Sequence, residues 1–170
     1  ADSPGFTDAF VIGKPTWQDG AILFDGKAHG LLLDRNVINL RRSTICVRVK
    51  WAGGAAMQPV WHFSRGQDFI QLTPSNHVGH LAVQGRFAGK TFTAGNSAAL
   101  PINVWTTLVV TLNGEVLSLS RDGKSQATTV LKATPHDFAG DTCYLARSDK
   151  AWFAGALDDF RVWSIDLNPN

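Results

Sequence analysis

The acidic residues decide first which chemistry this chain could perform. Cleaving a glycosidic bond takes two carboxyl groups, about 5 Å apart in retaining enzymes and further apart in inverting ones. Among the 14 acidic residues, Glu115 is the only glutamate, and Asp158 and Asp159 are the only adjacent pair. Because neighbouring side chains of a strand point to opposite faces, these two cannot hold one bond between them. The sequence therefore favours a structural role for both over catalysis.

Other catalytic arrangements are also missing from the sequence. A lyase needs a base and an acid, such as histidine with tyrosine, but the only tyrosine, Tyr144, lies in a run typical of a buried strand. The five histidines do not form the H-E-x-x-H spacing of a zinc hydrolase, and no serine lies in a G-x-S-x-G turn. A glycosidase or a lyase is therefore the least favoured interpretation.

The elements that must position any site are strands. Short β-branched and aromatic runs alternate with Gly, Asn, Asp and Pro, which is typical of a β-sandwich, and helical periodicity is nearly absent. We expect one domain over residues 1–170, with residues 94–99 as a loop. Asn113-Gly114 and Asp122-Gly123 predict hairpin turns of type I′. The expected strands cover residues 21–24, 30–33, 43–51, 60–63, 68–73, 80–84, 106–112, 116–120, 142–146 and 155–163.

Alternation along these runs predicts the core. In residues 43–51, Ile45, Val47 and Val49 share one face, while Cys46 and Arg48 share the other. Further side chains with the inward phase are Leu108, Val110, Leu112, Leu117, Leu119, Cys143, Phe160 and Val162.

Two consequences of this phase can be tested. Asp158 has the phase of Phe160, which predicts that its side chain enters the end of the sandwich. Cys46 and Cys143 have opposite phases, so we expect no disulfide between them, since a bridge requires facing Cβ atoms.

Outward polar side chains predict a binding face. Sugar sites combine aromatic rings with amides, arginines and carboxylates that bind hydroxyl pairs. Trp61 shares the phase of Phe63 and is expected in the core, whereas Trp152, just before the last strand, is expected to be exposed. The candidate carbohydrate-binding residues are Arg48, His62, Gln71, His80, Gln84 and Trp152.

Several segments, in order, resemble the laminin-G-like jelly rolls of secreted bacterial glycosidases, polysaccharide lyases and adhesins. Residues 1–5 resemble the family's opening loop, residues 20–26 its L-x-F-D-G strand, residues 44–50 its T-I-S-x-W-V-K strand, and residues 153–163 its closing strand. The resemblance implies an all-β, two-sheet antiparallel β-sandwich of the concanavalin A-like jelly-roll type. The family's usual first strand either precedes this segment in a longer parent or is missing, which would leave an open sheet edge.

The resemblance also suggests a structural calcium ion, which prefers oxygen ligands. Asp25 of the F-D-G turn and Asp158 of the closing strand would approach each other to hold it. The residues themselves slightly favour another interpretation, in which Asp25 makes an Asx turn with Gly26 and Asp158 accepts backbone N–H bonds.

Two functions remain open from the sequence. The first is a non-catalytic carbohydrate-recognition or accessory module, a lectin-like domain that binds a polysaccharide or oligosaccharide beside a flanking catalytic domain. The second is a structural or protein-interaction sandwich without a sugar site, in which a partner chain adds a strand to an open edge. Either protein would be secreted, extracellular or periplasmic.

Two other partners are not expected. A net charge of +2 without a basic cluster argues against nucleic acid. No run approaches the roughly 20 apolar residues of a membrane span.

Overall fold

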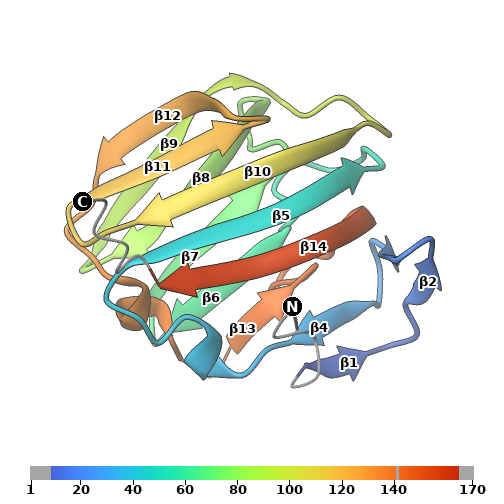
Figure 1. Cartoon of the computed structure of the whole chain (residues 1–170), viewed down its shortest axis with the longest axis horizontal. Coiled ribbons are helices and arrows are strands. Elements are labelled where there is room, and N and C mark those ends of the chain that lie inside the picture. Colours follow the sequence, from blue (N-terminus) through green and yellow to red (C-terminus); the bar gives the residue numbers. More distant parts are fainter. Residues whose placement is uncertain (1–8, 141, 165–170) are drawn as a thin grey trace.

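Two seven-stranded antiparallel sheets pack face to face in the computed structural model, which describes residues 9–140 and 142–164 (Figure 1). We name each sheet after one of its inner strands. The β7 sheet has the order β1-β4-β13-β6-β7-β8-β9, and the β5 sheet has the order β12-β11-β10-β5-β14-β3-β2. This arrangement confirms the expected two-sheet jelly-roll sandwich. The opening segment of residues 1–5 lies outside the described residues.

The strands and short 3₁₀ helices of the described residues have these bounds. The β7 sheet contains β1 (Phe10–Ile12), β4 (Gly30–Leu32), β6 (Trp61–Arg65), β7 (Asp68–Thr73), β8 (His80–Phe87), β9 (Lys90–Ala98) and β13 (Thr142–Leu145). The β5 sheet contains β2 (Thr16–Gln18), β3 (Ala21–Asp25), β5 (Ser43–Trp51), β10 (Trp105–Leu112), β11 (Val116–Arg121), β12 (Lys124–Val130) and β14 (Ala154–Ser164). The helices are η2 (Arg35–Val37) and η3 (Pro135–Phe138). Neither these nor any other described helix is long and apolar enough to cross a membrane.

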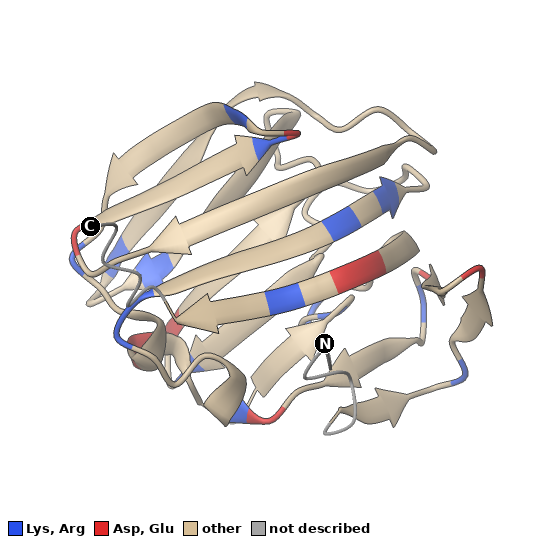
Figure 2. Ribbon diagram, viewed as in Figure 1, with Lys and Arg blue, Asp and Glu red and all other residues tan. Residues whose placement is uncertain are grey.

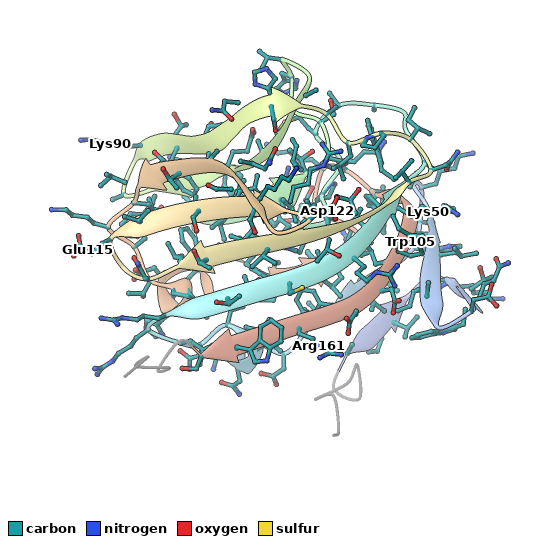
Figure 3. All side chains as sticks on the ribbon, turned by 45° about the horizontal axis from the view of Figure 1, so that its top comes forward. Lys50, Lys90, Trp105, Glu115, Asp122 and Arg161 are labelled. Atoms are coloured by element: carbon teal, nitrogen blue, oxygen red, sulfur yellow. The ribbon has the colours of Figure 1, made fainter. Side chains whose placement is uncertain are left out.

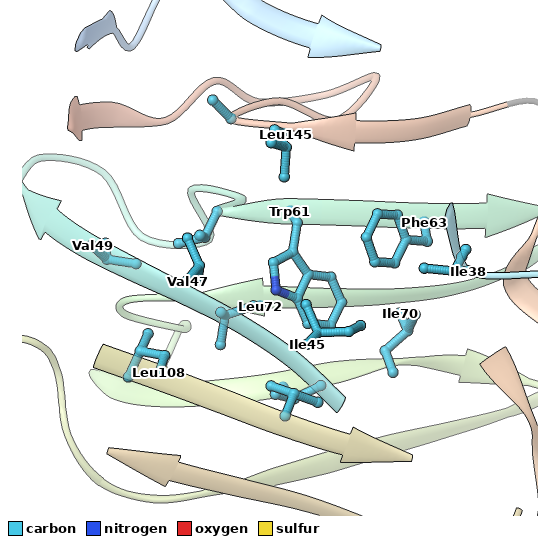
Figure 4. Close-up of a cluster of buried hydrophobic side chains, with 14 of the residues drawn as sticks. Ile38, Ile45, Val47, Val49, Trp61, Phe63, Ile70, Leu72, Leu108 and Leu145 are labelled. Carbon is cyan, nitrogen blue, oxygen red and sulfur yellow. The ribbon is translucent and has the colours of Figure 1, made fainter. Parts of the chain in front are cut away.

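The core fills the space between the sheets (Figure 4). Alternation correctly predicted the buried Ile45, Val47, Val49, Leu108, Val110, Leu112, Leu117, Leu119 and Cys143, while the predicted Phe160 and Val162 pack against the core only partly buried. Val47, Val49 and Leu108 of the β5 sheet are fully buried, and so is Trp61 of the β7 sheet. The Trp61 ring stacks on Phe63, with 4.8 Å between ring centroids. Because burying one large apolar side chain contributes about 1.5–3 kcal/mol, these inward rows supply the main driving force for folding.

The expectation that residues 94–99 form a loop is wrong, because β9 runs on to Ala98. Its small residues have a packing cause. A Cβ atom added at Gly95 would lie 2.4 Å from the carbonyl oxygen of Leu81 and 2.6 Å from the Cβ of Ala82. The lack of a side chain therefore lets β9 approach β8 closely at a register shift.

One of the two predicted turns has the expected geometry. Asp122 and Gly123 have φ values of 48° and 80°, and they close the β11–β12 hairpin as a type I′ turn does. The β10–β11 hairpin also forms, but its turn is not of type I′. There Gly114 has a positive φ and Asn113 does not, because the Asn113 side chain instead accepts the backbone N–H groups of residues 115 and 116.

A β-bulge in the closing strand overturns the phase predicted for Asp158. Asp158 lies opposite Arg48 and Arg161 lies opposite Cys46, so two residues of β14 oppose one residue of β5. Asp159, in the bulge, has a φ of 54°. The extra residue shifts the alternation, and the prediction that Asp158 enters the sandwich is therefore wrong. Its side chain lies on the outer face of the β5 sheet.

The two cysteines are not bridged to each other, as expected. Cys46 lies half-buried on the outer face of the β5 sheet, and Cys143 is buried in the β7 sheet. Burial raises the pKa of the Cys46 thiol, so less of the reactive thiolate is present at neutral pH.

A thiol reagent is therefore expected to modify Cys46 before Cys143 in the folded protein. The rate should keep increasing as the pH rises past about 8.5, the ordinary pKa of a thiol. Mass spectrometry should find one added label in the native protein and two after unfolding without reductant. A protein that accepts no label until it is reduced would contradict this expectation.

Candidate functional site

A groove of about 490 Å³ lies on the outer face of the β5 sheet. Strands β3, β5 and β14 form its floor, while β10 and the β2–β3 turn form its two sides. Side chains that line it include Gln18, Asp19, Leu23, Arg48, Lys50, Asn103, Trp105, Ala156 and Asp158.

The strand register explains why this surface is hollow. Trp105 lies opposite Lys50, Lys50 opposite Ala156, and Ala156 opposite Leu23, so these four side chains form one row across the sheet. Outward residues of neighbouring strands lie close together in such a row. The methyl group of Ala156 is much smaller than the side chains beside it. The surface of the sheet is therefore hollow at Ala156 in the middle of the row and rises at Trp105.

Charged side chains of the groove contact each other and the indole ring. Arg48 Nη1 donates a hydrogen bond to Asp158 Oδ2 at 3.1 Å, and both side chains remain partly exposed, at 41% and 30%. The Arg48 guanidinium lies 4.9 Å from the centroid of the Trp105 ring, and Lys50 Nζ lies 6.0 Å from it. Figure 2 shows the basic segment of β5 beside the acidic segment of β14, and Figure 3 shows Lys50 and Trp105 at the same end of the sheet. Such cation–π contacts hold the cations against the ring.

The groove therefore combines apolar surface with paired donors and acceptors. A guanidinium has five N–H donors, and a carboxylate accepts several hydrogen bonds, so the contact between Arg48 and Asp158 leaves both groups with further capacity. This combination suits a neutral, hydroxyl-rich molecule with an apolar face.

The other predicted site residues lie on the opposite face of the sandwich. His62, Gln71 and Gln84 form one row across the outer face of the β7 sheet. His62 Nδ1 lies 2.8 Å from Gln71 Oε1, and Gln71 is only 5% exposed. Burial lowers the pKa of His62, which keeps its ring neutral at neutral pH. His80 lies at one end of this face, where it lines a smaller hollow of about 260 Å³ with Gln84.

The structure thus divides the predicted set between two surfaces. Arg48 lines the groove on the β5 sheet, whereas the histidines and glutamines lie on the outer face of the β7 sheet. Because alternation assigns side chains to inner or outer faces but does not say which strands share a sheet, the sequence pattern merged the two surfaces.

Trp152 is half-buried, where the sequence predicted an exposed ring. Its ring centroid lies 4.4 Å from the guanidinium of Arg147, which lies 4.5 Å from the ring of Tyr144. The ring of the groove is instead Trp105, which the sequence analysis did not select. A signal was present, because the alternation that places Leu108 inward places Trp105 outward.

Asp25 and Asp158 do not fit a shared calcium site. Asp25 lies opposite Ala154, four residues from Asp158 along β14. At about 3.3 Å per strand residue, this separates the two positions by about 13 Å. The described residues also contain no group of three or more His, Cys, Asp or Glu side chains that could hold a metal ion.

Each of these carboxylates has another partner. Asp25 Oδ1 accepts the backbone N–H groups of Ala28 and Lys27 at 3.0 and 2.9 Å, and these bonds lower the pKa of Asp25. This is the turn-forming role that the sequence slightly favoured. Asp158, expected in that interpretation to accept backbone N–H groups, binds the Arg48 side chain instead.

Comparisons with known proteins identify the fold. The family model described as the concanavalin A-like lectin/glucanases superfamily matches residues 24–170. A search of curated protein sequences finds no significant relative.

Solved structures agree with the family model. Domain 4 of AbnA, a GH43 extracellular arabinanase from Geobacillus stearothermophilus solved with arabinotriose, has a TM-score of 0.81 at 13% identity, over 92% of this chain and 82% of its own. The CBM40 of the Ruminococcus gnavus IT-sialidase, bound to α2,3 sialyllactose, has a TM-score of 0.69 at 20% identity, over 88% and 92%. Domains LG4-5 of the mouse laminin α1 chain have a TM-score of 0.67 at 13% identity, over 88% and 43%. At these identities the likeness shows the fold alone.

Proposed function

Because the chain belongs to the concanavalin A-like lectin/glucanases superfamily, we propose that it is a non-catalytic carbohydrate-recognition module that binds an oligosaccharide or a segment of a polysaccharide. The observation that carries this proposal is the groove of the β5 sheet, where Trp105 lies beside the Arg48–Asp158 pair. Its volume of about 490 Å³ falls within the range of about 300–1,000 Å³ typical of small-molecule sites.

A sugar would use both kinds of surface in the groove. The apolar C–H face of the sugar ring would pack on Trp105, Leu23 and Ala156. Its hydroxyl groups would bind Arg48 and Asp158, whose hydrogen-bonding capacity is not exhausted by their mutual contact. Hydrogen bonds to charged groups contribute about 1.5–3 kcal/mol each, so a few of them suffice for recognition.

The carboxylates argue for binding without cleavage. Asp158 is paired with Arg48, and its neighbour Asp159 is paired with Arg161 at 2.7 Å. Glu115 lies at the far end of the β5 sheet from Trp105 (Figure 3). An arginine thus engages each of the two aspartates, and Glu115 is remote from the groove, which favours binding over cleavage by a two-carboxyl pair.

The setting of the structural neighbours suggests the setting of this chain. AbnA is an extracellular arabinanase, and the CBM40 belongs to a sialidase, so both neighbours are parts of carbohydrate-processing enzymes. We propose by analogy that this chain is an accessory module of a secreted, extracellular or periplasmic polysaccharide-processing protein. Its flanking domain would then carry the catalysis.

Replacing Trp105 with alanine is expected to weaken glycan binding about tenfold or more, because the loss removes apolar surface and the support of Arg48. Affinity electrophoresis through gels that contain different soluble polysaccharides measures this directly. Trp163→Ala is the matched control, since Trp163 is 46% exposed on β14 but does not line the groove. Failure of the unaltered chain to bind any polysaccharide, or equal binding by both variants, would refute the proposal.

A further inference from the structure

The Arg48–Asp158 pair offers a donor and an acceptor side by side at the floor of the groove. The two residues lie directly opposite each other on β5 and β14, and Arg48 Nη1 and Asp158 Oδ2 are 3.1 Å apart. Adjacent hydroxyl groups of a sugar ring are also separated by about one hydrogen-bond length. One hydroxyl can accept from the guanidinium while its neighbour donates to the carboxylate, as in other two-point contacts of arginine and carboxylate groups.

Two contacts position the arginine of the pair, which favours selection by geometry. Arg48 is fixed by Asp158 on one side and by the Trp105 ring at 4.9 Å on another. Its neighbours in β5, Val47 and Val49, are fully buried in the core. A site that is ordered before the ligand arrives loses less entropy on binding.

The charges of the groove cancel. Two basic side chains, Arg48 and Lys50, and two acidic ones, Asp19 and Asp158, line it. A third carboxylate lies close by, because Asp122 accepts the N–H group of Thr107, which lies opposite Arg48. A site for an acidic sugar would need a surplus of positive charge. No such surplus is present among the described residues of this surface.

We infer that the groove selects uncharged sugars with two adjacent free hydroxyl groups, which the Arg48–Asp158 pair binds as a two-point clamp. This inference rests on the proposed function and names the ligand class of the same site. The β-bulge at Asp159 is part of the clamp, because it shifts the alternation of β14 and so places Asp158 on the outer face beside Arg48.

The test uses affinity electrophoresis of the full chain in gels of neutral polysaccharides (arabinan, galactan, mannan and β-glucan) and acidic ones (polygalacturonate and alginate), at low and high salt. The inference predicts retention on at least one neutral gel, unchanged by salt, and no stronger retention on the acidic gels. Methyl glycosides of the retained sugar should compete, whereas analogues that lack one hydroxyl of the pair should not.

Substitutions distinguish loss of the Arg48–Asp158 clamp from the general effect of removing a charged side chain. Arg48→Gln and Asp158→Asn should each weaken retention about tenfold or more, and the double variant should lose little beyond the stronger single loss, because the two residues act as one unit. Arg86→Gln is the matched control, since Arg86 is exposed on β8 of the other sheet and does not line the groove. Its retention should match that of the unaltered chain.

The outcomes distinguish this inference from the proposed function. If the chain is retained on acidic gels, and salt or Lys50→Gln abolishes that retention, the inference of a clamp for neutral sugars is wrong. If Trp105→Ala also abolishes that retention, the proposed function of sugar binding in the groove is still supported. Full retention by Arg48→Gln would also overturn the clamp. An absence of retention on every gel would overturn both.

Discussion

Replacing Trp61 with alanine is expected to lower the free energy of unfolding by about 3–5 kcal/mol, the usual cost of removing a large aromatic side chain from a core. Trp61 is fully buried and stacks on Phe63. Its strand neighbours Leu72 and Leu145, on the two sides of β6, are also fully buried (Figure 4). Because these neighbours belong to the sheet that holds the ring, they cannot collapse fully into the space that it leaves. Urea unfolding followed by circular dichroism measures the loss.

A conservative variant tests the cause of that loss. The indole N–H of Trp61 is buried without a hydrogen-bond partner among the described residues. Leaving such a donor unsatisfied costs about 1–3 kcal/mol. Trp61→Phe removes this cost while it creates a smaller cavity, so it should lower stability far less than alanine does. The exposed Trp163→Ala should change stability by no more than about 0.5 kcal/mol. An equal loss for phenylalanine and alanine would contradict this expectation, since phenylalanine leaves the smaller cavity and also removes the unpaired N–H group.

The sequence predicted the fold correctly for strands in which one face packs on the core and the other meets solvent, because apolar and polar residues then alternate. The inward phase of Ile45, Val47 and Val49 was read correctly because one face of β5 meets the core and the other meets solvent. The same condition holds for β10 and β11. Ten strands were expected, and each has a counterpart in the structure.

The strands that were not predicted from the sequence lack this alternation of apolar and polar residues. β1 and β2 are three-residue edge strands whose side chains are mostly exposed, so no alternation marks them. β12 has no buried residue, and the hairpin turn at Asp122-Gly123 returns the chain along β11. β9 was hidden by small residues such as Gly95, whose role depends on the approach of β8. Pairing partners set β1, β2 and β9, and the local sequence does not reveal these three strands.

The site was harder to predict than the fold for two physical reasons. Alternation showed that Arg48 and Gln84 point outward, but it could not show that they lie on opposite sides of the sandwich. The bulge at Asp159 then shifted the phase of β14, which moved Asp158 from the expected interior to the groove. A single inserted residue reverses every assignment on one side of it. The partner of Arg48 could therefore be found only from the strand register.

Replacing Gly155 with alanine is expected to lower the free energy of unfolding by more than about 2 kcal/mol and to abolish glycan binding, because both backbone strain and a steric clash arise at this position. Gly155 has a φ of 146°, which residues with a side chain rarely adopt. A Cβ atom there would lie 2.2 Å from the carbonyl oxygen of Lys50 and 2.9 Å from the Phe153 ring. Relief of the clash must push β14 away from β5 where both strands form the floor of the groove.

The control separates strain from clash. Gly123 also has a positive φ, of 80°, but a Cβ atom there would contact nothing within 4 Å. Gly123→Ala should therefore cost only about 1 kcal/mol and leave binding intact. Both variants are compared by urea unfolding and by affinity electrophoresis under conditions in which they remain folded. If Gly155→Ala loses no more stability than Gly123→Ala and still binds, the close contact between β14 and Lys50 does not shape the groove. If it remains folded but no longer binds, the separation of β14 from β5 by a single methyl group is sufficient to destroy the site.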